Sequence, residues 1–176
     1  EKEKAIDIKT LRAQTGLITY DPGYKNTGSC KSEITYLNGE EGILHHRGYS
    51  IEELCSKASF LEVAFLLIFG DMPTKKELDL LNDEIRKDSL VDEDIKLILK
   101  SFPKSAHPMG ILASLTSGLI AFNPSTVNIK SEKSMREAII MLMAKFPILC
   151  SWTHRKVKGL PLNYANASLS YVENIA

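Results

Sequence analysis

The chain has 176 residues, of which 44% are hydrophobic and 25% are charged, and its 22 basic residues balance 22 acidic ones. This length and composition are typical of a soluble globular protein with one or two domains. The balanced charge argues against binding to nucleic acid or to an anionic membrane. The sequence shows no signal peptide, and its longest apolar runs, such as residues 63–69, are far too short to span a membrane.

The three cysteines, Cys30, Cys55 and Cys150, are far apart in the sequence. An odd number without metal-ligand spacing argues against a disulfide framework and against a zinc site. Free thiols are typical of a reducing compartment, so the sequence predicts a cytoplasmic protein.

Residues 34–49 predict a β-hairpin. Residues 34–37 are β-branched, apolar or aromatic, as expected for a strand. Asn38 and Gly39 tolerate positive φ at both positions of a tight turn. Residues 40–42 extend the loop or form a bulge, and residues 43–49 return as the second strand. Neighbouring side chains on a strand point to opposite faces, so His45 and His46 are not expected to share a metal ion.

From residue 50 onward the sequence is helical almost throughout. Capping boxes, in which Ser or Thr is followed three positions later by Glu, mark helix starts. They occur at Ser50/Glu53, Ser59/Glu62, Thr74/Glu77 and Ser134/Glu137. The pattern predicts helices at residues 51–56, 60–69, 75–88, 92–102, 109–122, 132–145 and 147–157, and another that begins near Ser168. We therefore divide the chain into a β-containing region, residues 1–49, and the first helices of a larger domain, residues 50–176.

Two of the predicted helices, residues 60–69 and 109–122, are apolar on nearly every side. Such a helix must be buried on every side, and a chain of this length has limited capacity to surround two of them. The last residues resemble a helix without a cap, which indicates a truncated chain. We therefore expect part of the apolar surface to contact either missing chain or a second subunit.

Several motifs together resemble bacterial citrate synthases. The longest are LNGEEGILHHRGYSIEEL at residues 37–54 and LEVAFLLIFGDMPTKKE at residues 61–77. The shorter ones are DPGY at 21–24, SCKS at 29–32, HPM at 107–109 and NASLSY at 166–171. The likeness covers nearly the whole chain and points to the amino-terminal part of that family.

The resemblance implies a mainly α fold class: part of the multi-helical large domain of citrate synthase, with a small N-terminal β-hairpin region. It implies an enzyme that joins acetyl-CoA to oxaloacetate to form citrate, without a metal or another cofactor. The family's catalytic histidines, aspartate and arginines lie beyond the region that this chain resembles. We therefore assign no catalytic residue and expect the chain alone to be inactive.

The resemblance also implies a homodimer that can assemble further into a hexamer, with the apolar helices 60–69 and 109–122 as the contact surface. Two alternatives for the function stay open. A 2-methylcitrate synthase has the same fold and chemistry but takes propionyl-CoA. A non-catalytic helical interaction or regulatory module has the fold without the chemistry.

His107, Pro108 and Met109 begin the second apolar helix. Pro108 suits the first helical position, which puts His107 at the N-cap, beside N–H groups that can also bind an anion. Helix initiation alone explains this pattern. The resemblance adds an allosteric nucleotide site in this neighbourhood, with His107 and Met109 as candidate residues.

The helix that starts near Ile148 ends in basic residues followed by Gly159. Cations in a last turn interact favourably with the helix dipole, and glycine suits the C-cap, so the pattern needs no ligand. The resemblance adds His154 and Lys156 as candidate nucleotide-binding residues.

Three consecutive carboxylates, Asp92, Glu93 and Asp94, could be considered as a catalytic pair of carboxylates. We interpret them as the first turn of helix 92–102, where negative charge is favoured, and find no catalytic pair. The sequence also contains no phosphate-binding loop and no metal-ligand motif.

Overall fold

The computed structural model describes residues 4–28, 30–166 and 168–175. It divides into two compact units, Glu1–Ile51 and Glu52–Ala176, and each is described by itself. The division of the chain into two domains, residues 1–49 and 50–176, stays a prediction. Within the described ranges, no helix has the length and apolar character needed to cross a membrane. The cytoplasmic location also stays a prediction.

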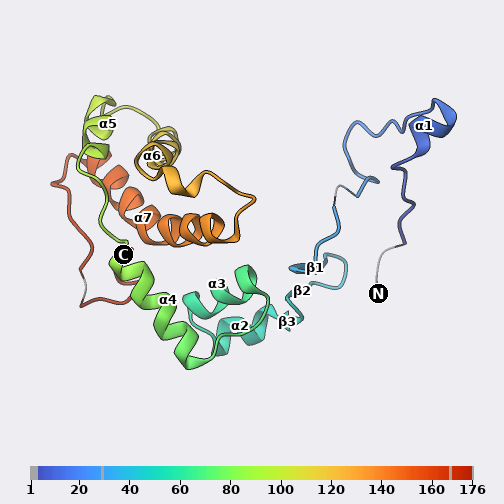
Figure 1. Cartoon of the computed structure of the whole chain (residues 1–176), viewed down its shortest axis with the longest axis horizontal. Coiled ribbons are helices and arrows are strands. Elements are labelled where there is room, and N and C mark those ends of the chain that lie inside the picture. Colours follow the sequence, from blue (N-terminus) through green and yellow to red (C-terminus); the bar gives the residue numbers. More distant parts are fainter. Residues whose placement is uncertain (1–3, 29, 167, 176) are drawn as a thin grey trace. The chain divides into compact units, whose positions relative to one another are not determined.

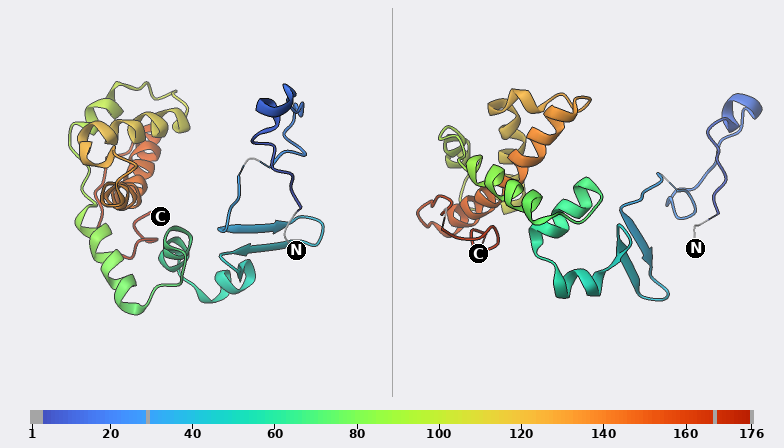
Figure 2. Two further views of the ribbon diagram at one scale, coloured as in Figure 1. Left: turned by 45° about the vertical axis from the view of Figure 1, so that its right-hand side comes forward. Right: turned by 60° about the horizontal axis from the view of Figure 1, so that its bottom comes forward.

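The first unit contains a short helix and a three-stranded antiparallel sheet (Figures 1 and 2). Its elements are α1 (Leu11–Thr15), β1 (Thr35–Asn38), β2 (Ile43–His46) and β3 (Tyr49–Ser50), in the order β1-β2-β3. The predicted hairpin is therefore present, but the predicted second strand, residues 43–49, is two strands. Arg47 (φ 50°) and Gly48 (φ 92°) form the turn that separates them.

The first hairpin turn is the extended loop, one of the two alternatives that the sequence left open. Asn38 pairs with Ile43, so residues 39–42 form a four-residue loop. The Asn38 side-chain oxygen accepts hydrogen bonds from the backbone N–H groups of Glu40 at 3.1 Å and Glu41 at 3.2 Å. Gly42, not Gly39, takes the positive φ, at 69°. Asn38 therefore makes the turn through its side chain, a local bond that asparagine forms readily.

The two strand histidines lie as the alternation predicted. His45 pairs with Tyr36, with ring centroids 6.0 Å apart, and His46 pairs with Thr35, whose hydroxyl lies 3.1 Å from the histidine Nδ1. Neighbouring residues of a strand face opposite sides of the sheet, so the two imidazoles have separate surroundings.

The helical unit follows the predicted pattern closely in its first half. Its helices are α2 (Ile51–Lys57), α3 (Phe60–Phe69), α4 (Lys75–Lys87), α5 (Ile95–Ser101), α6 (Pro108–Phe122) and α7 (Glu132–Lys158), with a 3₁₀ turn η1 (Pro124–Thr126). Complete capping boxes start α3, at Ser59 and Glu62, and α4, at Thr74 and Glu77. These two boxes are confirmed because every group that they need lies within four residues of sequence.

Several predicted boundaries are wrong. Helix α5 begins at Ile95 rather than 92, so the three carboxylates precede it. Ser131, not Ser134, caps α7, and the Ser134 hydroxyl instead donates to the carbonyl of Ser125 at 2.6 Å. Residues 168–175 form turns instead of a helix.

Predicted helices 132–145 and 147–157 are one continuous helix, α7, with Pro147 inside it. Proline has no N–H, so it cannot donate to the carbonyl four residues earlier, which is that of Met143. The hydroxyl of Tyr171 donates to this carbonyl at 3.0 Å. The helix therefore continues through the proline, and the bond that Pro147 cannot make is replaced by one from the end of the chain.

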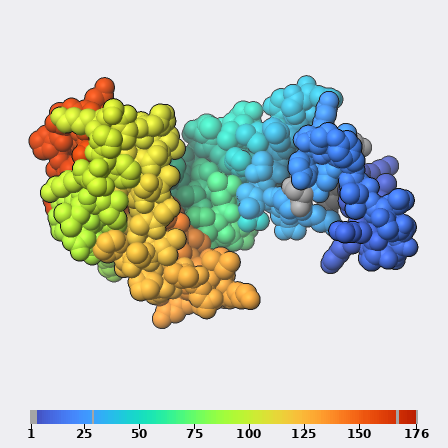
Figure 3. Space-filling model, turned by 90° about the horizontal axis from the view of Figure 1, so that it is seen from above, coloured from blue at the N-terminus to red at the C-terminus, as the bar shows by residue number. Residues whose placement is uncertain are grey.

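Two apolar clusters form the core, and α7 contributes to both. The larger one joins α5, α6 and α7, and Figure 3 shows the atoms of α5 and α6, lime to yellow, next to each other. The smaller one joins α3, α4 and α7. The larger cluster consists of Val91, Ile95, Leu99, Ile111, Leu112, Leu115, Leu119, Met141, Ile148, Leu149 and Trp152. The smaller cluster consists of Leu61, Leu81, Ile85, Ile140 and Ala144.

Candidate functional site

His107 caps α6, as the sequence predicted. Its Nδ1 accepts a hydrogen bond from the backbone N–H of Met109 at 3.2 Å, and Pro108 occupies the first helical position. Both His107 and Met109 are exposed. The imidazole therefore satisfies one of the N–H groups that every helix start leaves without an intrahelical partner.

His154 and Lys156 lie in the last two turns of α7, which ends at Gly159 with φ 71°. His154 is exposed, whereas the half-buried Lys156 donates from Nζ to the backbone carbonyl of Lys100 at 3.2 Å. That carbonyl belongs to the last turn of α5, where cations and donors are favoured. Lys156 thus ties the end of α7 to the end of α5.

The α5–α6 connection and the end of α7 border the same core, since Phe102, Ala106 and Val157 all pack against the larger cluster. Among the described residues, no hydrogen bond or ion pair joins His107 or Met109 to His154 or Lys156. The nucleotide-binding role of these four residues stays a prediction.

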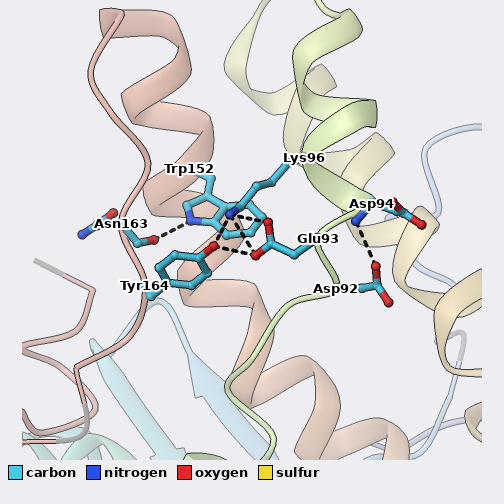
Figure 4. Close-up of polar contacts among 7 residues, drawn as sticks. All are labelled: Asp92, Glu93, Asp94, Lys96, Trp152, Asn163 and Tyr164. Atoms are coloured by element: carbon cyan, nitrogen blue, oxygen red, sulfur yellow. Dashed lines mark hydrogen bonds and ion pairs between the residues drawn. The ribbon is translucent and has the colours of Figure 1, made fainter.

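A second polar site, which the sequence did not indicate, lies where α5, α7 and the segment after α7 meet (Figure 4). We call it the Lys96 clasp, and it consists of Glu93, Lys96, Trp152 and Tyr164. The Lys96 ammonium contacts both carboxylate oxygens of Glu93, at 2.9 and 2.8 Å, and also contacts the Tyr164 hydroxyl. The Tyr164 hydroxyl donates to Glu93 at 2.5 Å.

Two aromatic rings surround the ammonium of the Lys96 clasp. Lys96 Nζ lies 4.2 Å from the centroid of the Tyr164 ring and 5.1 Å from that of the Trp152 ring. The two rings meet edge to face, with centroids 6.3 Å apart. The indole N–H of Trp152 donates to the backbone carbonyl of Asn163 at 2.6 Å. The clasp thus combines an ion pair with cation–π contacts, which are stronger when water is partly excluded.

The electrostatics of the clasp favour its charged groups. Hydrogen bonds from Lys96 and Tyr164 hold the pKa of Glu93 below its ordinary value. The same interactions with Glu93 and Tyr164 raise the pKa of Lys96. The charged and hydroxyl groups of the clasp are paired with one another, so we interpret it as a contact that fixes the chain rather than as a catalytic site.

Acid is expected to open the Lys96 clasp. The pKa of Glu93 is lowered from its ordinary value of 4.5 in the folded chain. The ionised Glu93 side chain therefore contributes its full stabilisation above pH 4.5, and this stabilisation is lost as the pH falls through the lowered pKa. Trp152 is the chain's only tryptophan, so its fluorescence should report this step. Glu93→Gln removes the titrating group, and acid titration curves that coincide for the two proteins would contradict the expectation.

Within the parts of the chain that the structure describes, no group of three or more His, Cys, Asp or Glu side chains is placed to hold a metal ion. The fold class is the expected one: a mainly helical protein with a small antiparallel sheet. The family model described as citrate synthase, C-terminal domain, matches residues 23–176. The chain belongs to the citrate synthase family.

Individual relatives agree with this assignment. The citrate synthase of Corynebacterium glutamicum is 44% identical over 174 residues, which are 99% of this chain and 40% of that protein. The chain thus spans about two fifths of the length of that relative. Its placement in the amino-terminal part of the family stays a prediction, since the matching family model is named after the C-terminal domain.

Solved structures show the same fold. The citrate synthase of Pyrobaculum aerophilum superimposes with a TM-score of 0.78 and 25% identity, over 98% of this chain and 46% of that one. The Thermotoga maritima citrate synthase gives a TM-score of 0.74 and 29% identity, over 89% and 40% of the two chains.

Proposed function

We propose that the protein to which this chain belongs condenses acetyl-CoA with oxaloacetate to form citrate. The observation that carries the proposal is the 44% identity to a citrate synthase over 99% of the chain. The reaction needs a base for the methyl proton, donors for the developing enolate and arginines for the dicarboxylate. We assign none of these roles to a residue of this chain, which supplies scaffold helices.

The test compares two proteins: the 176-residue chain, and the same chain extended to the length of its relatives. Release of the CoA thiol from acetyl-CoA and oxaloacetate is measured with a thiol reagent. We expect turnover from the extended protein and background release from the 176-residue chain. Turnover by the short chain would overturn our site assignment, and preference of the extended protein for propionyl-CoA would favour 2-methylcitrate synthesis.

Apolar surface on two helices supports the self-association that the sequence predicts. Phe60 on α3 is 54% exposed, and on α6 Met109 is 62% and Ile120 is 51% exposed. These exposed apolar side chains are available to a protein contact. The homodimer and the hexamer stay predictions. Sedimentation at micromolar concentration measures association directly, and a single monomeric species would contradict it.

A further inference from the structure

A cavity of about 220 Å³ lies in the helical unit between α4, α7 and the end of the chain. Figure 1 shows the segment at residues 168–175, coloured red, beside α4. We call residues 160–166 and 168–175 the strap, because they run along α7 without forming a helix. The cavity is lined by Asn82, Ile85, Arg86, Ser89, Leu90, Ala144, Pro147, Ile148, Ala165, Asn166, Leu169, Tyr171 and Asn174.

Most of this lining is apolar. Its polar groups differ in whether they already have hydrogen-bond partners. Asn174 is saturated, since its amide group donates to the carbonyls of Asn166, Leu169 and Ser170 and accepts from the N–H of Asn166. The Ser89 hydroxyl donates to a backbone carbonyl of α4. The Asn174 amide therefore holds the strap and is not available to a ligand, and the Ser89 hydroxyl has already used its proton.

Asn82 and Arg86 are different. They lie one helical turn apart on α4, so their side chains share a face, and both line the cavity. Among the described residues, neither side chain has a hydrogen-bond partner, and no carboxylate pairs with the Arg86 guanidinium. Among the described residues that line the cavity, Arg86 alone is charged, and it is an exposed residue. The free polar groups therefore favour an anion at the α4 wall.

The strap that covers the cavity is fixed on both sides of Ala165 and Asn166. On one side, Tyr164 belongs to the Lys96 clasp. On the other, Tyr171 donates to the Met143 carbonyl that Pro147 leaves free, and its ring stacks on Phe60 with centroids 5.2 Å apart. Pro147 interrupts the hydrogen bonding of α7 at the point where the strap docks, so this cover is specified by the sequence.

We propose that this cavity is a binding site for a small carboxylate with an apolar body. The carboxylate interacts with the Arg86 guanidinium and the Asn82 amide. The apolar body lies beneath the strap, against Ile85, Pro147 and Ile148. An Arg–carboxylate pair gives charge-assisted hydrogen bonds that fix the orientation of the ligand. The apolar walls favour a ligand whose remaining part is apolar and is easily desolvated.

The probe for this site is hexanoate, and hexan-1-ol is its neutral counterpart. Calorimetric titration of the 176-residue chain is expected to show saturable binding of hexanoate and weaker binding of hexan-1-ol. Arg86→Gln should weaken the binding of hexanoate about tenfold and leave the binding of hexan-1-ol unchanged. Lys87→Gln is the matched control, because it removes one positive charge from the same helix at a residue outside the lining.

A second variant tests the location. Ala165→Leu adds volume to the strap side of the cavity and is expected to abolish hexanoate binding while the circular dichroism spectrum stays that of the parent chain. The proposal is overturned if hexanoate does not saturate the parent chain. It is equally overturned if Arg86→Gln and Lys87→Gln bind hexanoate alike, or if a folded Ala165→Leu variant keeps the parent affinity.

Discussion

Trp152→Ala is expected to lower the free energy of unfolding by about 3–5 kcal/mol, the usual cost of removing a buried tryptophan. Trp152 is fully buried in the larger core cluster. The substitution leaves a cavity between α7 and its neighbours. It also removes the indole donor to Asn163 and one of the two rings around the Lys96 ammonium. Urea unfolding followed by circular dichroism measures the change, since the variant has no tryptophan to fluoresce.

Trp152→Phe separates packing from the hydrogen bond. Phenylalanine keeps most of the buried area but has no N–H, so we expect a loss of about 1–2 kcal/mol. Asn163 is an exposed residue, so water can replace the indole as the partner of its carbonyl. If the free energy of unfolding of Trp152→Ala lies within about 1 kcal/mol of that of the parent chain, the clasp and the core around it are not formed.

The features that the sequence predicted well are those decided by neighbouring residues. Ser59 with Glu62, and Thr74 with Glu77, complete their boxes within one turn. The mainly helical fold follows from many such local signals. A local bond also decides between the alternatives that the sequence left open for the hairpin. Asn38 uses its side-chain oxygen to close a four-residue loop, in which residues 40–42 extend the turn.

The features that the sequence missed depend on residues far apart in the chain. Pro147 predicts a helix end by the local rule, and that rule fails because a hydroxyl 28 residues from Met143 takes the free carbonyl. The Lys96 clasp joins residues 68 positions apart. Within the clasp, the sequence could have predicted only the pair of Glu93 and Lys96, because these residues lie three positions apart at a helix start. Residues 160–166, which contain Tyr164, have no helix or strand periodicity that would have predicted their contacts.

Lys145→Ala is expected to lower the free energy of unfolding by about 2–4 kcal/mol, somewhat less than the usual cost of breaking a fully buried ion pair. The Lys145 side chain is only 6% exposed. Its ammonium donates to the Asp88 carbonyl at 2.6 Å and to the Asp88 carboxylate at 2.5 Å. Lys145 therefore links α7 to the end of α4, where backbone carbonyls lack intrahelical partners. The Asp88 carboxylate is 41% exposed, so water can solvate it in the variant and limit the loss.

Lys145→Met distinguishes the ammonium from its hydrocarbon stem. Methionine keeps most of the buried stem and loses the two bonds to Asp88, so we expect a cost of about 1–2 kcal/mol. Urea unfolding monitored by Trp152 fluorescence measures both variants. If methionine costs as much as alanine, the ammonium accounts for the whole effect, and the α4–α7 contact is held by charge. If alanine alone is costly, the stem is a packing element, and the bonds to Asp88 contribute little because water replaces them at the exposed carboxylate. The α4 wall of the cavity is anchored at this point, so the first result would also make the affinity for hexanoate sensitive to Lys145→Met.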